Sequence, residues 1–514
     1  MFSFIKKHFD LIGYIALTIF FVVLNYNLYI NMDLLIDSDM ASEMLYSKLL
    51  VENKSLFLNN WYYSTAIETL DIPLVFAPLF LLTNNWHTVR IVGIIILDIL
   101  LYLSFYYVCK QLDIKHIPWL AFLILGSVSN EYFDFVLKGS YYIPYIMVTF
   151  IATGLLLDIS KNKNNIKLTL LIILSILAGL NGLRQLVQCF ACLFGSSLLL
   201  IIFRQFEKIK EKTINKKEET YILLKYSFIS LFFSSIGYLI NMFLLSSLYS
   251  FKSDWDLKIE IASISRIKDI IYGWATMFGY ETGYIWTIII SILFIIILCI
   301  SIIYLLKKYN KDNKVVFIIL LFFISTITTF CIFIFTNMNL QIRYFIQVFV
   351  NSILIIGLLI DKLSFNKQTL LICIILCMSI ICTSFQFNKD VNNSTNSDLI
   401  LIKDILIEND SLEGYGSFWN ANVMTELSDG KIEVWNFHNY EEDDGVDINN
   451  LDKWLQKKEH FERKPNGKVF LILTYMQKDK VDINEKIDKY CCFEGKNRIL
   501  YIFNNINEFN SIFK

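Results

Sequence analysis

Charged residues are scarce in this 514-residue chain, where Asp, Glu, Lys and Arg together make up 18% of the sequence. Hydrophobic residues make up 55%, and the mean hydropathy is +0.51. This composition excludes an ordinary soluble protein. Several apolar runs of about 20 residues are long enough to cross a hydrocarbon core of roughly 30 Å. The sequence therefore predicts a polytopic α-helical membrane protein.

Other absences narrow the possibilities further. No small-residue cleavage site follows the first apolar stretch, which therefore reads as a retained signal anchor. Eight of the ten cysteines lie in or beside apolar segments and are expected to be inert, so no disulfide framework is implied. No repeat of fixed period is evident. The net charge of -1 gives no support for a nucleic-acid partner, and we expect none.

Eleven apolar runs are the candidate membrane spans. They lie at about 10–31, 86–109, 117–131, 140–158, 166–181, 185–204, 221–248, 283–306, 314–335, 342–360 and 367–385. The loops on the N-terminal side are all basic, for example "KNKNNIK" and "KKYNKDNK", whereas the opposite loops are acidic or mixed. The positive-inside rule then predicts a cytoplasmic N-terminus. With an odd number of spans, the C-terminal tail is expected outside the cell membrane.

The chain divides into a transmembrane domain (1–385), a polar linker (386–398) and a small extracytoplasmic α/β domain (399–514). In the tail, "SLEGYGSF", "KIEVWNF", "KVFLILTY" and "NRILYIF" predict strands, while "NANVMTELSDG" and "INNLDKWLQKKEHF" predict helices. The long first outer loop (32–85) contains "SEMLYSKLLVEN" and "IPLVFAPLFLL", which are typical of helices that lie in the membrane interface. Such a loop can cover a cavity at the membrane surface.

Three acids follow the first span within a few residues, in "DSDMASE". Asp37 and Asp39 stand two residues apart, and Glu43 lies one helical turn beyond Asp39. A carboxylate at the membrane boundary can act as a general base that removes a proton from a hydroxyl group. The alternative is structural, with Ser38 or Asp39 capping the helix that follows.

Isolated basic residues lie on the same outer side, against the charge bias of the topology. They are Arg90, Lys138, Arg184 and Arg343. Basic groups near hydrocarbon are costly, and the guanidinium fork of arginine matches a phosphate group. The alternative for each is contact with a lipid headgroup. Together with the three acids, they favour a site that holds an anionic phosphate next to a carboxylate base, with His87, Tyr141 and Tyr142 as candidate substrate-binding residues.

The motif "DSDMASE", the covering loop with "NWYYST", the eleven spans and the outer C-terminal domain resemble the GT-C glycosyltransferases. The similarity is to the bacterial branch related to protein mannosyltransferases and the aminoarabinose transferase of lipid A. It covers residues 1–385. The tail stretch "GYGSFWNANVMTELSDGKIEVW" also resembles the tails of uncharacterised bacterial membrane proteins of that superfamily.

The resemblance implies a transferase that moves a sugar, with inversion, from a polyprenyl-phosphate donor to a hydroxyl acceptor on the outer face of the membrane. The family's first-loop catalytic acid corresponds to Asp37 or Asp39, and its phosphate-binding arginines to Arg184 and Arg343. Relatives with a monophosphate donor typically need no metal, whereas relatives with a strict Asp-x-Asp motif can bind a divalent ion. We therefore expect no cofactor, and the "DSD" sequence leaves a divalent metal possible.

Two other functions fit a membrane protein of this composition. A transporter or flippase of polyprenyl-linked glycans would carry charges within its spans, but apart from Asp98 the spans here are almost free of acids. A non-catalytic protein of cell-envelope assembly would use the tail to bind a partner, and "SFWNANV" and "EVWNFHNY" offer aromatic residues for this. The tail has no Ser/His/Asp arrangement, and its histidines, His438 and His460, are isolated.

Overall fold

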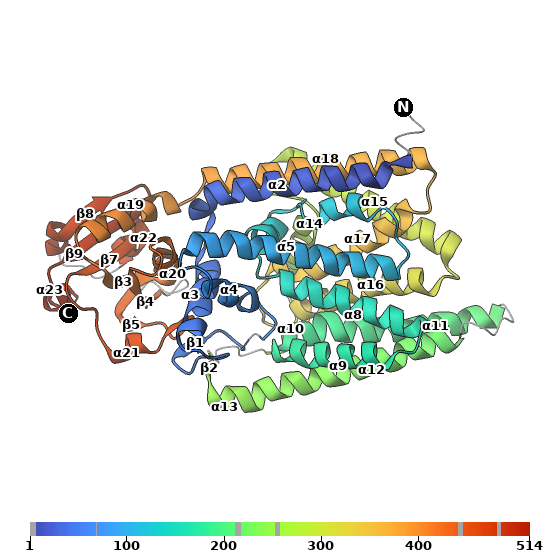
Figure 1. The fold of residues 1–514 in the computed structure, drawn as a ribbon, viewed down its shortest axis with the longest axis horizontal. Coiled ribbons are helices and arrows are strands. Elements are labelled where there is room, and N and C mark those ends of the chain that lie inside the picture. The colour runs from blue at the N-terminus through green and yellow to red at the C-terminus, as the bar shows by residue number, and fades with distance from the viewer. Residues whose placement is uncertain are drawn as a thin grey trace.

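The computed structural model describes residues 7–67, 69–210, 217–251, 258–439, 446–480 and 485–513. Figure 1 shows a bundle of long helices with a smaller, sheet-containing domain at one end. The first helix, α2 (Phe9–Leu35), starts at the opposite end of the bundle and runs toward that domain beside the last bundle helix, α18 (Phe365–Asn392) (Figure 1). The N-terminal end of the bundle and the C-terminal domain are therefore far apart.

Nine stretches of the described residues are long and apolar enough to cross a membrane. Besides α2 and α18 they are α5 (Trp86–Gln111), α8 (Ile143–Lys161), Leu183–Gln205, Glu219–Leu248, α15 (Ile285–Tyr309), α16 (Asn313–Phe335) and Ile342–Ile360. Apolar side chains on the outside of the bundle stay exposed, such as Ile19 at 59% and Ile289 at 64%, which suits contact with lipid. The chain is thus a multi-pass membrane protein.

Three of these spans are composite. Leu183–Gln205 is formed by α10 (Leu183–Gln185), the π-helical turn η3 (Leu186–Ala191) and α11 (Cys192–Lys210). Glu219–Leu248 is formed by α12 (Lys217–Leu239), the π-helical turn η4 (Ile240–Leu245) and α13 (Ser246–Leu248). Ile342–Ile360 is formed by the short 3-10 helix η5 (Ile342–Phe345) and α17 (Ile346–Ile360). The helix α9 (Asn165–Leu180) was also predicted as a span, but with 16 residues it is about 24 Å long and shorter than these nine stretches.

The predicted span at 117–131 is wrong as a single helix. It contains only α6 (Ile117–Leu120) and the 3-10 turn η1 (Ala121–Leu123), followed by α7 (Asn130–Tyr132) and the π-helical turn η2 (Phe133–Lys138). The stretch still passes from one end of the bundle to the other, because Lys115 N donates to Asp361 and Lys138 pairs with Asp390 near the C-terminal domain. Irregular backbone is tolerated here because protein surrounds it, and Thr383 Oγ1 of α18 accepts from Ser127 N at 2.8 Å.

The first loop confirms the two helix predictions. Its helices are α3 (Ser38–Glu52) and α4 (Pro73–Phe80), and between them lies the short strand β1 (Trp61–Tyr63). A proline at the first position of α4 suits a helix start, since that position needs no N–H donor. On the other long loop of this side, the strand β2 (Ser250–Phe251) and the helix α14 (Ile264–Met277) precede α15.

The C-terminal domain is built on a six-stranded mixed sheet with the order β5-β4-β3-β7-β9-β8. Its strands are β3 (Glu413–Ser417), β4 (Glu433–Asn439), β5 (Val446–Leu451), β7 (Val469–Thr474), β8 (Cys491–Glu494) and β9 (Arg498–Phe503). Its helical segments are α19 (Asn396–Glu408), α20 (Phe418–Leu427), α21 (Glu459–Glu462), α22 (Tyr475–Lys480), η6 (Glu485–Tyr490) and α23 (Ile506–Ile512). The four strands expected from the sequence and the helix α20 are confirmed.

Two predictions for this part of the chain were wrong. The stretch 386–398, expected to be a polar linker, is mostly helical, because α18 continues to Asn392 and α19 starts at Asn396. The helix expected at 448–461 is instead strand β5, an irregular turn, the two-residue strand β6 (Gln456–Lys457) and the start of α21. All ten cysteines lie in the described residues and are free.

The C-terminal domain is docked on the first loop. Strand β1 pairs in parallel with β2 and antiparallel with β6, so three distant parts of the chain share one small sheet. Helix α20 packs on α3, where Ser38 Oγ donates to Phe418 O at 2.7 Å. Buried apolar residues of the domain, such as Met424 and Phe470, belong to the same hydrophobic core as the bundle. The first loop and the domain therefore form one packed unit.

Candidate active site

A cavity of about 210 Å³ lies where the first loop, the ends of several membrane helices and the C-terminal domain meet. Its charged and hydroxyl lining consists of Asp39, Ser42, Glu43, Ser64, Thr65, Asp71, Arg184 and Arg343. Its aromatic lining consists of Tyr46, Trp61, Tyr63, Tyr141, Tyr142, Tyr145, Tyr344 and Trp454. Acids from the first loop and arginines from the membrane helices, expected from the sequence to share one face, thus line one space.

The structure distinguishes the two aspartates of the "DSD" motif. Asp37 is the N-cap of α3, with Oδ1 accepting from Met40 N at 2.8 Å, so it occupies the capping position expected for Ser38 or Asp39. Asp39, in the first turn of α3, lines the cavity. Burial, and then the negative charge of Asp37, raise the pKa of Asp39 to about 6, although the positive charge of Arg343 lowers it. Asp39 is therefore a stronger base than an ordinary aspartate.

Glu43 lies one turn further along α3 and also faces the cavity. Beside it, Tyr46 OH and Tyr63 OH are 3.3 Å apart, and Tyr63 OH accepts from Leu58 N at 2.7 Å. Burial raises the pKa of Tyr46 well above its usual value, and the nearby Tyr63, Glu43 and Asp71 raise it further. Tyr46 therefore stays a neutral phenol next to two carboxylates.

Asp71 is a cavity residue that the sequence analysis missed. It is 7% exposed and precedes α4 in the otherwise apolar run "LDIPLVF". A charged residue at the start of an interfacial apolar helix was the signal that could have identified it.

Arg184 and Arg343 lie together at the membrane-helix end of the cavity. The Arg184 guanidinium lies over the rings of Tyr142, Tyr145 and Tyr344, 4.7 to 5.0 Å from their centroids, and Nη2 donates to Tyr344 OH at 3.2 Å. Gly182, with a φ of +91°, provides the sharp turn between α9 and α10 that presents Arg184.

Arg343 is in η5, after the non-helical stretch 337–341, and its guanidinium lies over the Phe135 ring at 5.0 Å. Its Nε is buried and has no hydrogen-bond partner within the described residues. Such an orphan donor is rare in a folded protein, and an acceptor group of a ligand would satisfy it.

Glutamines extend this basic end of the cavity. Next to it is a much smaller cavity of about 10 Å³, lined by Arg184, Arg343, Gln185, Gln188 and Gln347 among others. Gln188 Nε2 donates to Tyr344 O at 3.1 Å, whereas the buried Nε2 atoms of Gln185 and Gln347 have no partner in the described part of the chain. Sequence analysis missed these residues, although "LRQLVQ" and "RYFIQ" place amides in apolar spans.

Tyr141 and Tyr142, predicted to bind substrate, both line the main cavity. They follow the turn at Ser140, whose φ is +62°, and Tyr142 is the N-cap of α8. Burial raises the pKa of Tyr141, and the carboxylates of Asp37 and Asp39 raise it further. Tyr141 therefore stays a neutral phenol next to the acids, and the Tyr142 ring lines the same cavity.

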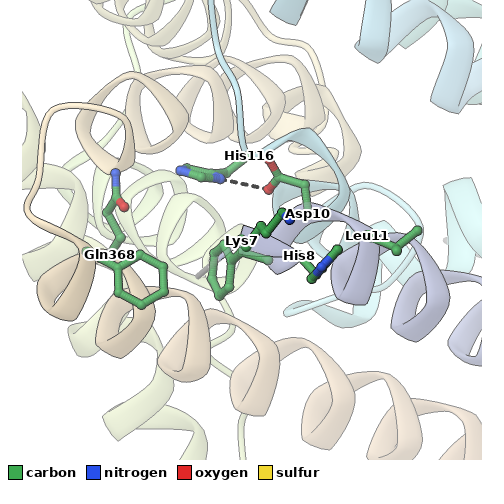
Figure 2. Close-up of a pocket in the computed structure, with 8 residues that line it drawn as sticks. Lys7, His8, Asp10, Leu11, His116 and Gln368 are labelled. Carbon is green, nitrogen blue, oxygen red and sulfur yellow. Dashed lines mark hydrogen bonds and ion pairs between the residues drawn. The ribbon is translucent and has the colours of Figure 1, made fainter. Parts of the chain in front are cut away.

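A second, larger cavity lies at the other end of the bundle. It has a volume of about 430 Å³ and is lined by residues from the start of α2, by His116 and by Phe365 and Gln368 of α18. In Figure 2, His116 Nδ1 is bonded to Asp10 Oδ1, at 2.8 Å. Among the described residues that line this cavity, Asp10 is the one acid and is bonded to His116, and none is an arginine. These lining residues therefore do not offer the combination of a free base and phosphate-binding groups found in the smaller cavity.

No protein-family model and no curated protein sequence matches this chain. Among solved structures, the crystal structure of ArnT from Cupriavidus metallidurans bound to undecaprenyl phosphate is similar. The match has a TM-score of 0.56 and 9% sequence identity, and it covers 94% of this chain and 97% of ArnT. The chain has the GT-C fold of integral membrane glycosyltransferases. The resemblance inferred from the first-loop motif is thus confirmed at the level of the fold.

Within this GT-C fold, three predicted site residues lie away from the cavity lining. Lys138 is bonded to Asp134 at 2.6 Å and to Asp390 at 2.7 Å, an arrangement that ties η2 to α18. His87 Nδ1 lies 3.3 Å from Asp33 Oδ1 and its ring packs against Tyr29. Since each polar head already has a partner outside the cavity, neither residue is part of the site described below.

Arg90 is also placed elsewhere. It is 1% exposed and forms a bidentate ion pair with the buried Glu426 of the C-terminal domain, with Nη2 to Oε2 at 2.6 Å. Arg90 Nη2 also donates to Met40 O, next to Asp39, at 2.9 Å. Arg90 therefore joins α5, α20 and α3, and it does not line the cavity.

The described acidic residues of the cavity do not form a recognisable metal site. Across the described ranges, no three His, Cys, Asp or Glu side chains converge in a way that could hold a metal ion. In the "DSD" motif, Asp37 Oδ1 is already engaged by Met40 N. The two aspartates thus have separate structural settings within the GT-C fold.

Proposed function

We propose that this protein is a glycosyltransferase that moves a sugar from a polyprenyl-phosphate donor to a hydroxyl acceptor at the membrane surface. The main support for this proposal is that Asp39, which has a raised pKa, lines the same cavity as Arg184 and Arg343. The similarity in fold to ArnT bound to undecaprenyl phosphate supports the choice of a polyprenyl-linked donor.

In the proposed reaction, Asp39 is the general base. It takes the proton of the acceptor hydroxyl as the acceptor oxygen bonds to the anomeric carbon. The bond from that carbon to the phosphate oxygen breaks, and the polyprenyl phosphate leaves with the electron pair. A single displacement of this kind inverts the anomeric configuration. A base with a pKa of about 6 is mostly ionised at pH 7 and takes up a proton more readily than an ordinary aspartate.

Arg184 and Arg343 are proposed to hold the donor phosphate. Guanidinium groups in a site shielded from bulk water stabilise the charge that develops on the leaving oxygen. The buried donors of Arg343 Nε, Gln185 Nε2 and Gln347 Nε2 add unsatisfied hydrogen-bonding capacity at this end. Because these groups can supply the electrostatic stabilisation, we propose a reaction that needs no metal ion.

The test is an assay of the purified protein in detergent, with polyprenyl-phosphate sugars and a panel of hydroxyl acceptors. We expect transfer by the native protein and a loss of about 10²–10⁴-fold in kcat/KM for Asp39→Asn. The matched control is Asp37→Asn, because an asparagine oxygen can still cap α3. We expect this variant to lose less than about tenfold.

Equal activity of the native protein and Asp39→Asn would reject Asp39 as the base. Movement of the polyprenyl-linked sugar across a bilayer without transfer would instead support the transporter reading. Transfer measured in detergent and movement measured in vesicles that contain the protein together separate the enzyme from its main alternative.

A further inference from the structure

The C-terminal domain contributes a wall to the cavity that faces α3. Trp454 and Leu455 lie in the turn between β5 and β6, and both line the cavity together with Glu43 and Asp71. The turn is held next to the first loop because β6 pairs with β1, with Gln456 opposite Tyr62, and Lys458 N donates to Asn60 O at 2.8 Å. A turn separated from the acids by more than 370 residues of sequence thus borders the same space.

Buried hydrogen bonds fix the shape of this turn. Gln456, which is 2% exposed, exchanges two hydrogen bonds of 3.1 Å with the backbone of Asn436 and also donates to Asp452 O. Asn422 Nδ2 donates both to Leu455 O at 3.0 Å and to Ser42 Oγ at 2.7 Å. Ser42 and Leu455 both line the cavity, so Asn422 fixes the turn against α3 at this point of the lining.

The backbone of the turn is strained. Leu455 has a φ of +47°, in the left-handed region that is unfavourable for a non-glycine residue. A strained residue persists when surrounding contacts determine its conformation, and such residues concentrate at ligand-binding sites. Here the contacts of Asn422 and Gln456 hold the conformation that directs Trp454 and Leu455 to the cavity.

The groups in the cavity are segregated. Arg184 and Arg343 are at the end shared with the small glutamine-lined cavity, whereas Glu43, Asp71 and Trp454 line only the main cavity. Carboxylates accept hydrogen bonds from hydroxyl groups, and aromatic rings contact the apolar faces of a sugar ring.

We propose that the Asp452–Leu455 turn forms the acceptor side of the site, where Trp454 stacks on the sugar ring of a carbohydrate acceptor and Glu43 and Asp71 bind its hydroxyls. This inference rests on the function proposed above. It assigns to the C-terminal domain the selection of the acceptor, while donor binding and the base stay on the membrane side.

Binding, measured without catalysis, is the first test. Saturation-transfer NMR in a sugar-free detergent would use the methyl β-glycosides of glucose, galactose and N-acetylglucosamine as probes. We expect saturation transfer with the native protein, with Asp39→Asn and with Trp454→Phe, and loss of the signal with Trp454→Ala. The matched control is Trp419→Ala, which removes a half-exposed tryptophan of the same domain outside the cavity lining.

Equal signals for the native protein and Trp454→Ala, or no signal with any of the glycosides for the native protein, would overturn the proposal. So would a Trp454-dependent signal with a serine peptide or a fatty alcohol and none with the glycosides, because the acceptor would then be of another class.

The second test uses turnover. With a donor that the native protein uses, we expect Trp454→Ala to raise KM for a carbohydrate acceptor about tenfold or more, with partial rescue in Trp454→Phe. An unaltered KM would overturn the role of Trp454 and leave the transferase proposal intact, whereas binding without any transfer would reject the transferase proposal alone.

Discussion

The pH dependence of transfer provides the sharpest test of Asp39, because its neighbours act on it in opposite directions. Its pKa of about 6 arises from burial and from the charge of Asp37, with Arg343 lowering it. A general base works in its ionised form, so kcat/KM of the free enzyme should fall as the pH decreases through 6. The ionised fraction is about nine-tenths at pH 7 and about one-tenth at pH 5, which predicts a roughly tenfold loss between them.

The acidic limb of the pH profile is the range in which kcat/KM falls as the pH decreases. Two variants should shift this limb in opposite directions. Asp37→Asn removes a negative charge that raises the pKa of Asp39, so its limb should lie at a lower pH than in the native protein. Arg343→Gln removes a positive charge that lowers the pKa, so its limb should lie above pH 6. Arg343→Lys is the control for charge, because it weakens phosphate binding but keeps the positive charge.

The assay is the pH profile of kcat/KM, at a fixed ionic strength, for the native protein and the three variants. The shape of each profile matters more than its height, because Arg343 also contacts the proposed phosphate site and its loss will reduce activity at every pH. A native limb near pH 4, the value of an ordinary aspartate, would refute the assignment. So would shifts of Asp37→Asn and Arg343→Gln in the same direction.

The remaining predictions concern stability and cofactor use. Asp37→Ala should destabilise the protein by about 1 kcal/mol through the lost cap, seen as a lower unfolding temperature that Asp37→Asn does not share. Arg90→Met should cost about 3–5 kcal/mol because it leaves Glu426 charged and buried, and Arg90→Met combined with Glu426→Leu should recover most of the loss; equal unfolding temperatures for the single and double variants would contradict this. EDTA should leave transfer within twofold of the untreated rate, and a loss restored by Mg²⁺ or Mn²⁺ would disprove the metal-free proposal.

Local patterns in the sequence were sufficient for much of the fold. Long apolar runs located most of the spans, and the short apolar runs in "KVFLILTY" and "NRILYIF" located strands β7 and β9, which have neighbours on both sides in the sheet. The helix predicted at 448–461 failed because its apolar residues also suit other structures, and pairing with β4 and β1 decided between them. Those partners are distant in sequence, so no local pattern reveals them.

The same reason explains the residues that the structure places elsewhere. Lone basic residues on the outer side were all read as possible phosphate ligands, but Lys138 is bonded to Asp390, 252 residues away, and Arg90 to Glu426, 336 residues away. Apart from Asp134, which lies four residues before Lys138, these acidic partners could not be recognised from the sequence around each base. Arg184 and Arg343 differ because aromatic rings lie against their guanidinium groups, and both line the cavity.

The docking of the C-terminal domain also determines where Asp39 lies. Helix α3 is too short to be stable alone, so its position depends on tertiary packing. Arg90 holds the backbone at Met40, one residue after Asp39, and Glu426 of the C-terminal domain fixes Arg90. Asn422, which lies on α20 like Glu426, donates a hydrogen bond to Ser42, three residues after Asp39. Helix α20 therefore fixes α3 at Met40 and at Ser42, and through Asn422 it also holds the turn after β5. The C-terminal domain thus positions both the base and the proposed acceptor wall. The membrane helices position the two arginines independently.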